Sequence, residues 1–146
     1  MVGWSNTLKS MALLRFKPLD HPSEIGIIAY GKTQREIYEN AAFGMFSLMA
    51  DLDKVTPKQI IGVRVMGENP QSLLVNWLNE LVFLEDSKKM LFRKFTVKQL
   101  SGTALEAEVC GEKIDLKTHQ LHRPIKAATY SQLQLDENQA TIIFDV

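Results

Sequence analysis

The sequence has only one cysteine, Cys110, and no long run of apolar residues. A single cysteine cannot form an intramolecular disulfide or a cysteine-based zinc cluster, which fits a reducing compartment and no disulfide-linked partner. No apolar run approaches the ~18 residues that a membrane-spanning helix needs, and the first residues lack the apolar core of a signal peptide. We therefore expect a cytoplasmic protein with no membrane partner.

Glycine and proline are also sparse, with 8 and 5 of the 146 residues, whereas 45% of the residues are hydrophobic. This composition supplies enough apolar surface for a buried core and argues against wholesale disorder. The length suits one domain. We predict a disordered leader over residues 1–10 and a single domain over residues 11–146.

The sequence has no excess of charge of either sign. Its 17 basic residues balance 17 acidic residues, so the formal net charge at pH 7 is zero. This balance removes the electrostatic expectation of a dedicated binder of nucleic acids or anionic membranes. A local basic patch is still compatible with it.

Capping residues and apolar periodicity predict two helices. Thr33 and Glu36 indicate a capping box, in which Thr33 accepts from the N3 amide and Glu36 reaches back to the cap amide. Asn69 suits the N-cap of the second helix and Pro70 its first position, and we expect the helices to end near 51–54 and 85–89. Apolar stripes at three- and four-residue spacing are expected to face a sheet: Ile37, Ala41, Met45, Leu48 and Leu52, widened by Tyr38, Ala42 and Met49, and then Leu74, Trp77, Leu78, Leu81 and Leu84.

Apolar segments bounded by turn residues predict the strands. They fall over residues 12–19, 25–31, 59–66, 91–98, 105–110, 124–135 and 139–146, with a long loop over residues 111–124. The resulting order is β-β-α-β-α-β-β-β-β, in which short hairpin links outnumber helical crossovers. We therefore predict an α+β fold, a mostly antiparallel or mixed β-sheet sandwich covered by two α-helices.

The histidines and carboxylates form no recognisable catalytic pattern. His119 and His122 lie three residues apart, which could suit a metal, but we favour solvated or core-satisfied imidazoles because no third ligand is near in sequence. Seven acidic residues between Glu68 and Glu112 are expected to form a solvated face. Because no zinc-protease, phosphate-loop or dinucleotide-binding motif is present, we favour a binding or accessory domain over an enzyme.

Four further residues have simple structural interpretations. Cys110 lies in a predicted strand and is expected to be a small buried hydrophobe. Trp77 and Phe83 are expected to lie in the core. Lys126 interrupts an apolar strand, where an outward-pointing side chain on a two-sided strand is favoured.

Four segments, in order and at matching spacing, carry a family resemblance. Residues 19–27 read LDHPSEIGI, like the pattern L-D-H-T-A-D-I-G-[IV], and residues 73–81 read LLVNWLNEL, like L-L-x-x-W-L-N-E-L. The segment GEKIDLKTH at 111–119 is followed by IKAATY at 125–130, near V-K-A-[IV]-T-Y, and the sequence ends at Asp145 and Val146, where the family typically stops at D-I or D-V. From Phe16 to Val146 the chain thus resembles archease, a small family that assists the GTP-dependent tRNA-splicing ligase.

The resemblance implies the expected α+β sandwich and the role of an accessory protein, not of an enzyme. Archease promotes guanylylation of the active-site histidine of the ligase and supports its multiple turnover. The chemistry therefore belongs to the ligase, and RNA would be met only through it. An alternative hypothesis is a chaperone-like binding module associated with tRNA modification or processing enzymes. A small metal-dependent enzyme is a third and more distant one, because no base or nucleophile is paired with the expected ligands.

The resemblance also implies a divalent-cation site, reported as calcium in the family. Its ligands are the last acid of the first segment and the two C-terminal residues, which places them here at Glu24, Asp145 and Val146. Glu24 stands where the family has aspartate and is one methylene longer, which the loose geometry of Ca²⁺ tolerates better than that of Mg²⁺. Lys126 matches the lysine of V-K-A-x-T-Y and is expected to meet phosphate or an acidic ligase surface.

Overall fold

Two β-sheets face each other across a pair of helices in this computed structural model, which describes residues 14–20 and 23–146. The larger sheet has the order β1-β2-β8-β6, with β7 also paired to β8, and the smaller has the order β3-β5-β4. Every strand pair is antiparallel. The strands of the larger sheet are β1 (Phe16–Pro18), β2 (Ile25–Tyr30), β6 (Ala127–Ala128), β7 (Gln134–Leu135) and β8 (Gln139–Asp145). Those of the smaller sheet are β3 (Gln59–Met66), β4 (Met90–Leu100) and β5 (Ala104–Lys113). The predicted α+β class is confirmed.

The first helix, α2 (Gln34–Met49), begins at the predicted N-cap. The Thr33 hydroxyl accepts from the amide of Glu36 at 3.1 Å, but the Glu36 carboxylate accepts from the amide of Lys32 and not from the cap amide. The helix ends where Ala50 turns extended and forms an isolated bridge with Leu121. A short 3₁₀ helix, η1 (Leu52–Lys54), follows.

The second helix, α3 (Pro70–Lys88), also begins at its predicted cap. The Asn69 side chain accepts from the amide of Ser72 at 2.8 Å, and the Ser72 hydroxyl accepts from the amide of Asn69 at 3.1 Å. This reciprocal box holds the first turn in place. Lys89 ends the helix in a left-handed conformation with φ 54°.

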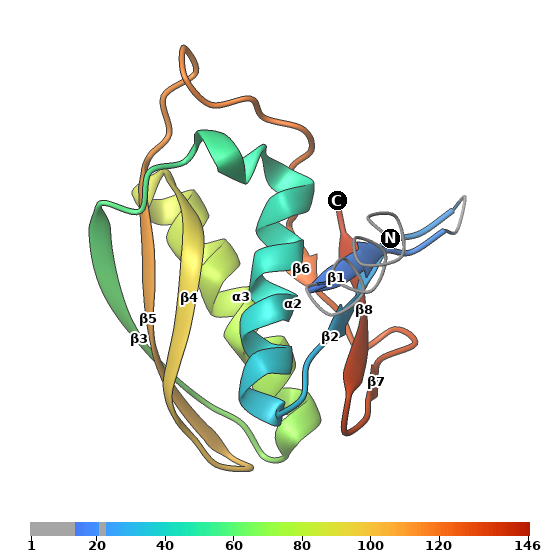
Figure 1. Cartoon of the computed structure of the whole chain (residues 1–146). Coiled ribbons are helices and arrows are strands. Elements are labelled where there is room, and N and C mark those ends of the chain that lie inside the picture. The colour runs from blue at the N-terminus through green and yellow to red at the C-terminus, as the bar shows by residue number, and fades with distance from the viewer. Residues whose placement is uncertain (1–13, 21–22) are drawn as a thin grey trace, which may run out of the picture.

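Both helices lie between the sheets, as Figure 1 shows, and they are therefore buried on more than one face. In α2 the buried residues are Ile37, Tyr38, Ala41, Ala42, Gly44, Met45, Phe46 and Met49, while Leu48 is half-buried. In α3 they are Leu73, Leu74, Val75, Trp77, Leu78, Leu81 and Leu84. The Trp77 indole donates to the carbonyl of Tyr38 at 2.9 Å, which ties the two helices together. Phe83 is 61% exposed, so its predicted place in the core is wrong.

Two predicted boundaries in the last third of the chain are also wrong. The single strand expected over 124–135 is split into β6 and β7 by a turn, in which the amide of Leu133 donates to the carbonyl of Tyr130. The loop expected from residue 111 begins only after β5 ends at Lys113. Gly111 lies within β5, next to the backbone of Leu91 in β4. A Cβ at this position would overlap that backbone, so the glycine permits close strand pairing and does not mark the start of the loop.

The N-terminal predictions are only partly covered by the described residues. The strand expected over 12–19 is observed as the shorter β1, and residues 12–13 lie outside the described ranges, as does the predicted leader over 1–10. Across residues 14–20 and 23–146, no helix is long and apolar enough to cross a membrane.

Candidate functional site

The pairing of β2 with β8 brings two distant acidic residues to one edge of the larger sheet. Ile25 is the register partner of Phe144, so Glu24, just before β2, and Asp145, the last residue of β8, extend the same antiparallel ladder. Residues on neighbouring antiparallel strands lie within about 5 Å of their partners. A side chain from the start of the fold thus meets the last residues of the chain.

A cleft of about 390 Å³ lies at this edge and contains all three of the residues expected to bind metal. Glu24, Asp145 and Val146 line it, together with the hydroxyl residues Thr129 and Ser131. Glu24 is half-buried, whereas Asp145 and Val146 are exposed. The fold thus brings these three residues to one edge of the larger sheet.

The Glu24 side chain accepts hydrogen bonds from a residue of the turn between β6 and β7. The side-chain amide nitrogen of Gln132 donates to both carboxylate oxygens, at 3.1 Å to Oε1 and 3.1 Å to Oε2. Gln132 lies in the turn between β6 and β7 and has a left-handed backbone, with φ 52°. This contact joins the turn to the start of β2.

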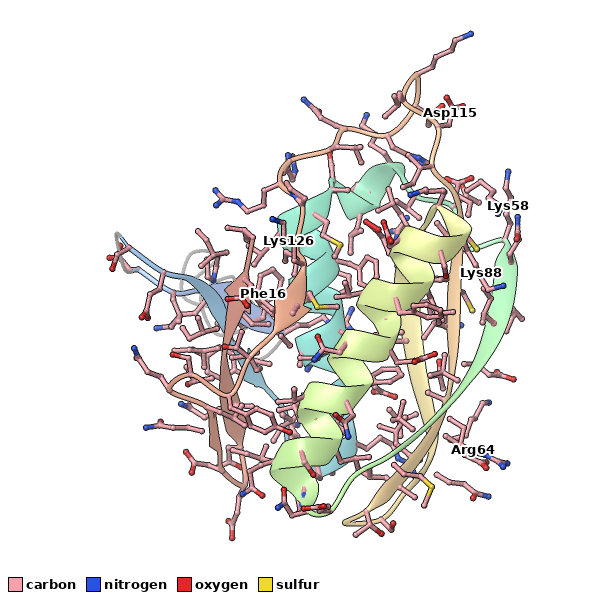
Figure 2. The ribbon with its side chains drawn as sticks, turned by 180° about the vertical axis from the view of Figure 1, so that it is seen from behind. Phe16, Lys58, Arg64, Lys88, Asp115 and Lys126 are labelled. Atoms are coloured by element: carbon pink, nitrogen blue, oxygen red, sulfur yellow. The ribbon has the colours of Figure 1, made fainter. Side chains whose placement is uncertain are left out.

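Lys126 lies beside the same edge, at the end of the loop that connects β5 to β6. Its backbone amide donates to the carbonyl of Asp145 at 2.8 Å, and the next residue, Ala127, is the register partner of Asp145. The Lys126 side chain is exposed, in agreement with the outward orientation predicted for it. Figure 2 shows it where the loop returns to the sheet, with Asp115 near the other end of the loop.

Helix α3 holds β6 in place through Asn79. The Asn79 side chain accepts from the amide of Ala128 at 2.7 Å and donates to the carbonyl of the same residue at 3.2 Å. The amide side chain therefore pairs with β6 as a neighbouring strand would. Because β6 in turn pairs with β8, this clamp fixes the backbone of Lys126 relative to Asp145.

The donor set of the cleft fits a hard divalent cation. The side chains of Glu24 and Asp145 and a carboxylate at Val146 would supply charged oxygens, which Ca²⁺ and Mg²⁺ prefer as ligands. No three side chains of histidine, cysteine, aspartate or glutamate are grouped for a metal anywhere in residues 14–20 and 23–146. A cation here would therefore need oxygen ligands besides the side-chain carboxylates of Glu24 and Asp145.

A second cluster of polar residues lies inside the molecule and was not predicted. Glu112 is buried, and its Oε2 accepts from the amide of Thr56 at 2.7 Å and faces Nε2 of His119 at 2.8 Å. The amide of Asp115 donates to Nδ1 of His119 at 2.9 Å, so the proton of the neutral ring is on Nε2 and points at Glu112. Lys58 lies 3.3 Å from Oε1. The prediction that the carboxylates from Glu68 to Glu112 are solvated is wrong for Glu112.

Hydrogen bonding controls the ionisation of this buried carboxylate. The Thr56 amide, and then the His119 ring, lower the pKa of Glu112 to about 2. His119 is buried, in agreement with a core-satisfied imidazole, and His122 is exposed on the surface of the loop. Cys110 is buried as predicted. The Glu112 cluster therefore secures the long loop to β5. It lies away from the cleft lined by Glu24, Asp145 and Val146, which we call the acidic cleft.

Comparison with known proteins identifies the family of this chain. The profile of the Archease protein family (MTH1598/TM1083) matches residues 16–146. The chain belongs to the archease family. A "Protein archease" of Sulfolobus acidocaldarius is 34% identical over 132 residues, which cover 90% of this chain and 95% of that relative. Another, of Sulfurisphaera tokodaii, is 37% identical over 123 residues, covering 84% and 88%. The solution structure of Methanobacterium thermoautotrophicum protein 1598 has a TM-score of 0.76 at 34% identity and covers 90% of this chain and 99% of that one.

The archease motifs have distinct places in this fold. The segment at 19–27 leads into β2, the segment at 125–130 contains β6, and the C-terminal pair ends β8, so these three meet at the acidic cleft. The segment at 73–81 lies in α3 and is joined to the segment at 125–130 by the Asn79 clamp. His21 lies outside the described residues. The contact of Gln132 with Glu24 was not predicted, because no local pattern in the sequence indicates it.

Proposed function

We propose that this archease is an accessory protein that activates an RNA ligase of the tRNA-splicing type, promoting its guanylylation and its multiple turnover. In this proposal the ligase carries out guanylylation and ligation, and the archease makes or breaks no bond. The observation that carries it is the convergence of Glu24, Asp145 and Val146 in one cleft, with Lys126 beside it. Family membership supplies the reaction that such a site would serve.

Glu24, Asp145 and the carboxylate of Val146 would hold the divalent cation in this proposal. Ca²⁺ is favoured because it accepts bidentate and irregular carboxylate ligation, and Mg²⁺ is the alternative. When bound, the cation would supply positive charge to phosphate oxygens of the ligase reaction. The three residues lie at an open edge of the sheet, with Asp145 and Val146 exposed, which suits delivery to a partner surface.

Lys126 would contribute a second, fixed positive charge. The pairing of β6 with β8 and the Asn79 clamp hold its backbone next to Asp145, while its ammonium group remains exposed. A compact, strongly hydrated charge on a flexible stem suits phosphate or an acidic protein surface. Cation and lysine would therefore act on the same partner.

A multiple-turnover ligation assay with the RNA ligase of the same organism tests the proposal. The parent protein is expected to raise the amount of product per ligase molecule, and Asp145→Ala is expected to lose most of that stimulation. Asp136→Ala is the matched control, because Asp136 is an exposed acid in the hairpin between β7 and β8, outside the cleft. It is expected to stimulate as the parent does.

Thermal unfolding without added metal accompanies this assay. We expect Asp145→Ala to unfold at the same temperature as the parent or slightly above it, because removing one of several neighbouring carboxylates reduces their repulsion. Full stimulation by Asp145→Ala would reject the acidic cleft as the functional site. No stimulation by the parent would reject ligase activation. If the parent instead raised the recovery of an aggregating tRNA methyltransferase, that result would support the chaperone-like alternative.

A further inference from the structure

The contact between Gln132 and Glu24 occupies both oxygens of an expected cation ligand. We propose that Gln132 competes with the cation for Glu24 and so lowers the affinity of the site and adjusts its selectivity. This inference rests on the cation site proposed above. It adds a residue that neither the sequence motifs nor the comparisons assign to that site.

The chemistry of the two side chains fixes the orientation of the contact. An ionised carboxylate only accepts hydrogen bonds, whereas a glutamine amide donates through its nitrogen and accepts through its oxygen. The Gln132 nitrogen must therefore face Glu24, and it lies 3.1 Å from each of the two oxygens. Because the nitrogen is equally far from the two oxygens, it takes the place between them that a cation bound by both oxygens would need. The amide and such a cation cannot hold Glu24 in this way together.

The backbone around Gln132 delivers its side chain to this position. Gln132 has φ 52°, a left-handed conformation that residues other than glycine and asparagine rarely adopt. The preceding turn is anchored to β8, since the Thr129 hydroxyl donates to the carbonyl of Ile143 at 2.9 Å and accepts from the amide of Ser131 at 3.2 Å. The strand that carries Asp145 therefore also holds the turn that carries Gln132.

Gln132 can leave Glu24 without disturbing the core. Gln132 is exposed, and its side-chain amide meets the Glu24 carboxylate at the surface of the molecule. Withdrawal would return the amide to water, where it is fully hydrogen-bonded. Competition thus requires a change of rotamer only, and the fold need not open.

The bidentate contact also discriminates between cations. Ca²⁺ commonly takes both oxygens of a carboxylate, whereas the small octahedral Mg²⁺ is usually bound through fewer protein oxygens and keeps several waters. A cation that used one oxygen of Glu24 would leave the other to Gln132. Removal of the amide should therefore improve Ca²⁺ binding more than Mg²⁺ binding.

Calorimetric titration of the full chain with CaCl₂ and with MgCl₂ tests this inference. Gln132→Met keeps the length of the side chain and removes its donor, and Gln132→Gly removes the side chain while favouring the left-handed turn. Both variants are expected to bind Ca²⁺ roughly three- to tenfold more tightly than the parent, the gain typical of removing one net hydrogen bond from the competing state. The gain for Mg²⁺ is expected to be less than twofold. Gln134→Met, an exposed position in β7, is the control and should bind as the parent does.

Nuclear magnetic resonance provides a second readout. The side-chain amide signals of Gln132 should shift on saturation of the parent with Ca²⁺, while those of Gln134 should not. Unchanged or weaker Ca²⁺ binding in both Gln132 variants would overturn the competition, and a gain confined to Gln132→Gly would too, because it would arise from the backbone. A parent that binds neither cation would overturn the proposed cation site itself, which distinguishes that failure from a failure of Gln132 alone.

Discussion

Replacement of Glu112 by alanine should destabilise the fold by about 2–4 kcal/mol at pH 7. The His119 side chain is 1% exposed, so its Nε2–H group would lose its acceptor in a place that water does not reach, at a cost of about 1–3 kcal/mol. The amide of Thr56 is only partly buried and would be rehydrated, which limits its share to about 1 kcal/mol. Lys58 is 62% exposed, and its ion pair with Glu112 adds little.

Urea unfolding followed by far-ultraviolet circular dichroism measures this difference. Glu108→Ala is the matched control: Glu108 lies in the same strand, β5, and pairs with Lys98 at 3.5 Å with both side chains about half exposed. Its loss should change the free energy of unfolding by less than about 1 kcal/mol. Equal losses for the two variants would refute the argument that burial of the His119 donor makes Glu112 important.

The stabilisation by Glu112 should also depend on pH, with a sign that follows from its pKa. The folded structure lowers this pKa from the ordinary 4.5 to about 2, so below pH 4.5 the unfolded chain binds the proton first. The stabilisation is therefore complete above about pH 4.5 and is lost as the pH falls toward 2. The difference between the parent and Glu112→Ala should shrink over that window, and a difference that stayed constant would contradict the assigned hydrogen bonds.

Two further predictions concern α3. Leu78→Ala truncates a fully buried side chain and should lower the free energy of unfolding by about 2–5 kcal/mol in the same urea titration. Phe83→Ala, at a 61% exposed position, is the control and should change it by less than about 1 kcal/mol. Similar losses for the two variants would mean that the buried face of α3 is wrongly assigned. Asn79→Ala removes both side-chain hydrogen bonds to Ala128, so the amide of Ala128 should exchange with deuterium much faster while amides in the middle of α2 keep their rates. Unchanged exchange at Ala128 would show that Asn79 does not hold β6.

Local signals in the sequence predicted the helices well. Thr33 and Asn69 have side chains that cap the first turn, and such short-range hydrogen bonds are visible in the order of residues alone. The apolar stripes identified the buried faces, Tyr38 included, but not the burial of Phe46. The spacing of apolar residues indicates which face of a helix is apolar. It does not indicate that the helix lies between two sheets and is buried on further faces.

Contacts that depend on long-range pairing could not be predicted in the same way. The burial of Glu112 depends on His119 and Thr56, which only the folded loop and the link between η1 and β3 bring to it. The convergence of Glu24 with Asp145 required the register of β2 on β8, and only the family resemblance indicated it in advance. Gly111 was assigned to the start of the long loop because the close approach of β4 leaves no trace in the local sequence.

The pairing of β2 with β8 has a consequence for the order in which this protein folds. β4 and β5 are joined by a short hairpin, and β5 also pairs with β3, so the smaller sheet closes only short or moderate stretches of chain. In contrast, the pairing of β2 with β8 joins Ile25 to Phe144, which lies more than a hundred positions later in the sequence. Since closing a longer loop loses more chain entropy before any contact compensates for it, we expect the smaller sheet and the helices to assemble first and β8 to dock last. The acidic cleft would then exist only in the completed fold, and partial opening of the larger sheet would remove it while most of the molecule stayed intact.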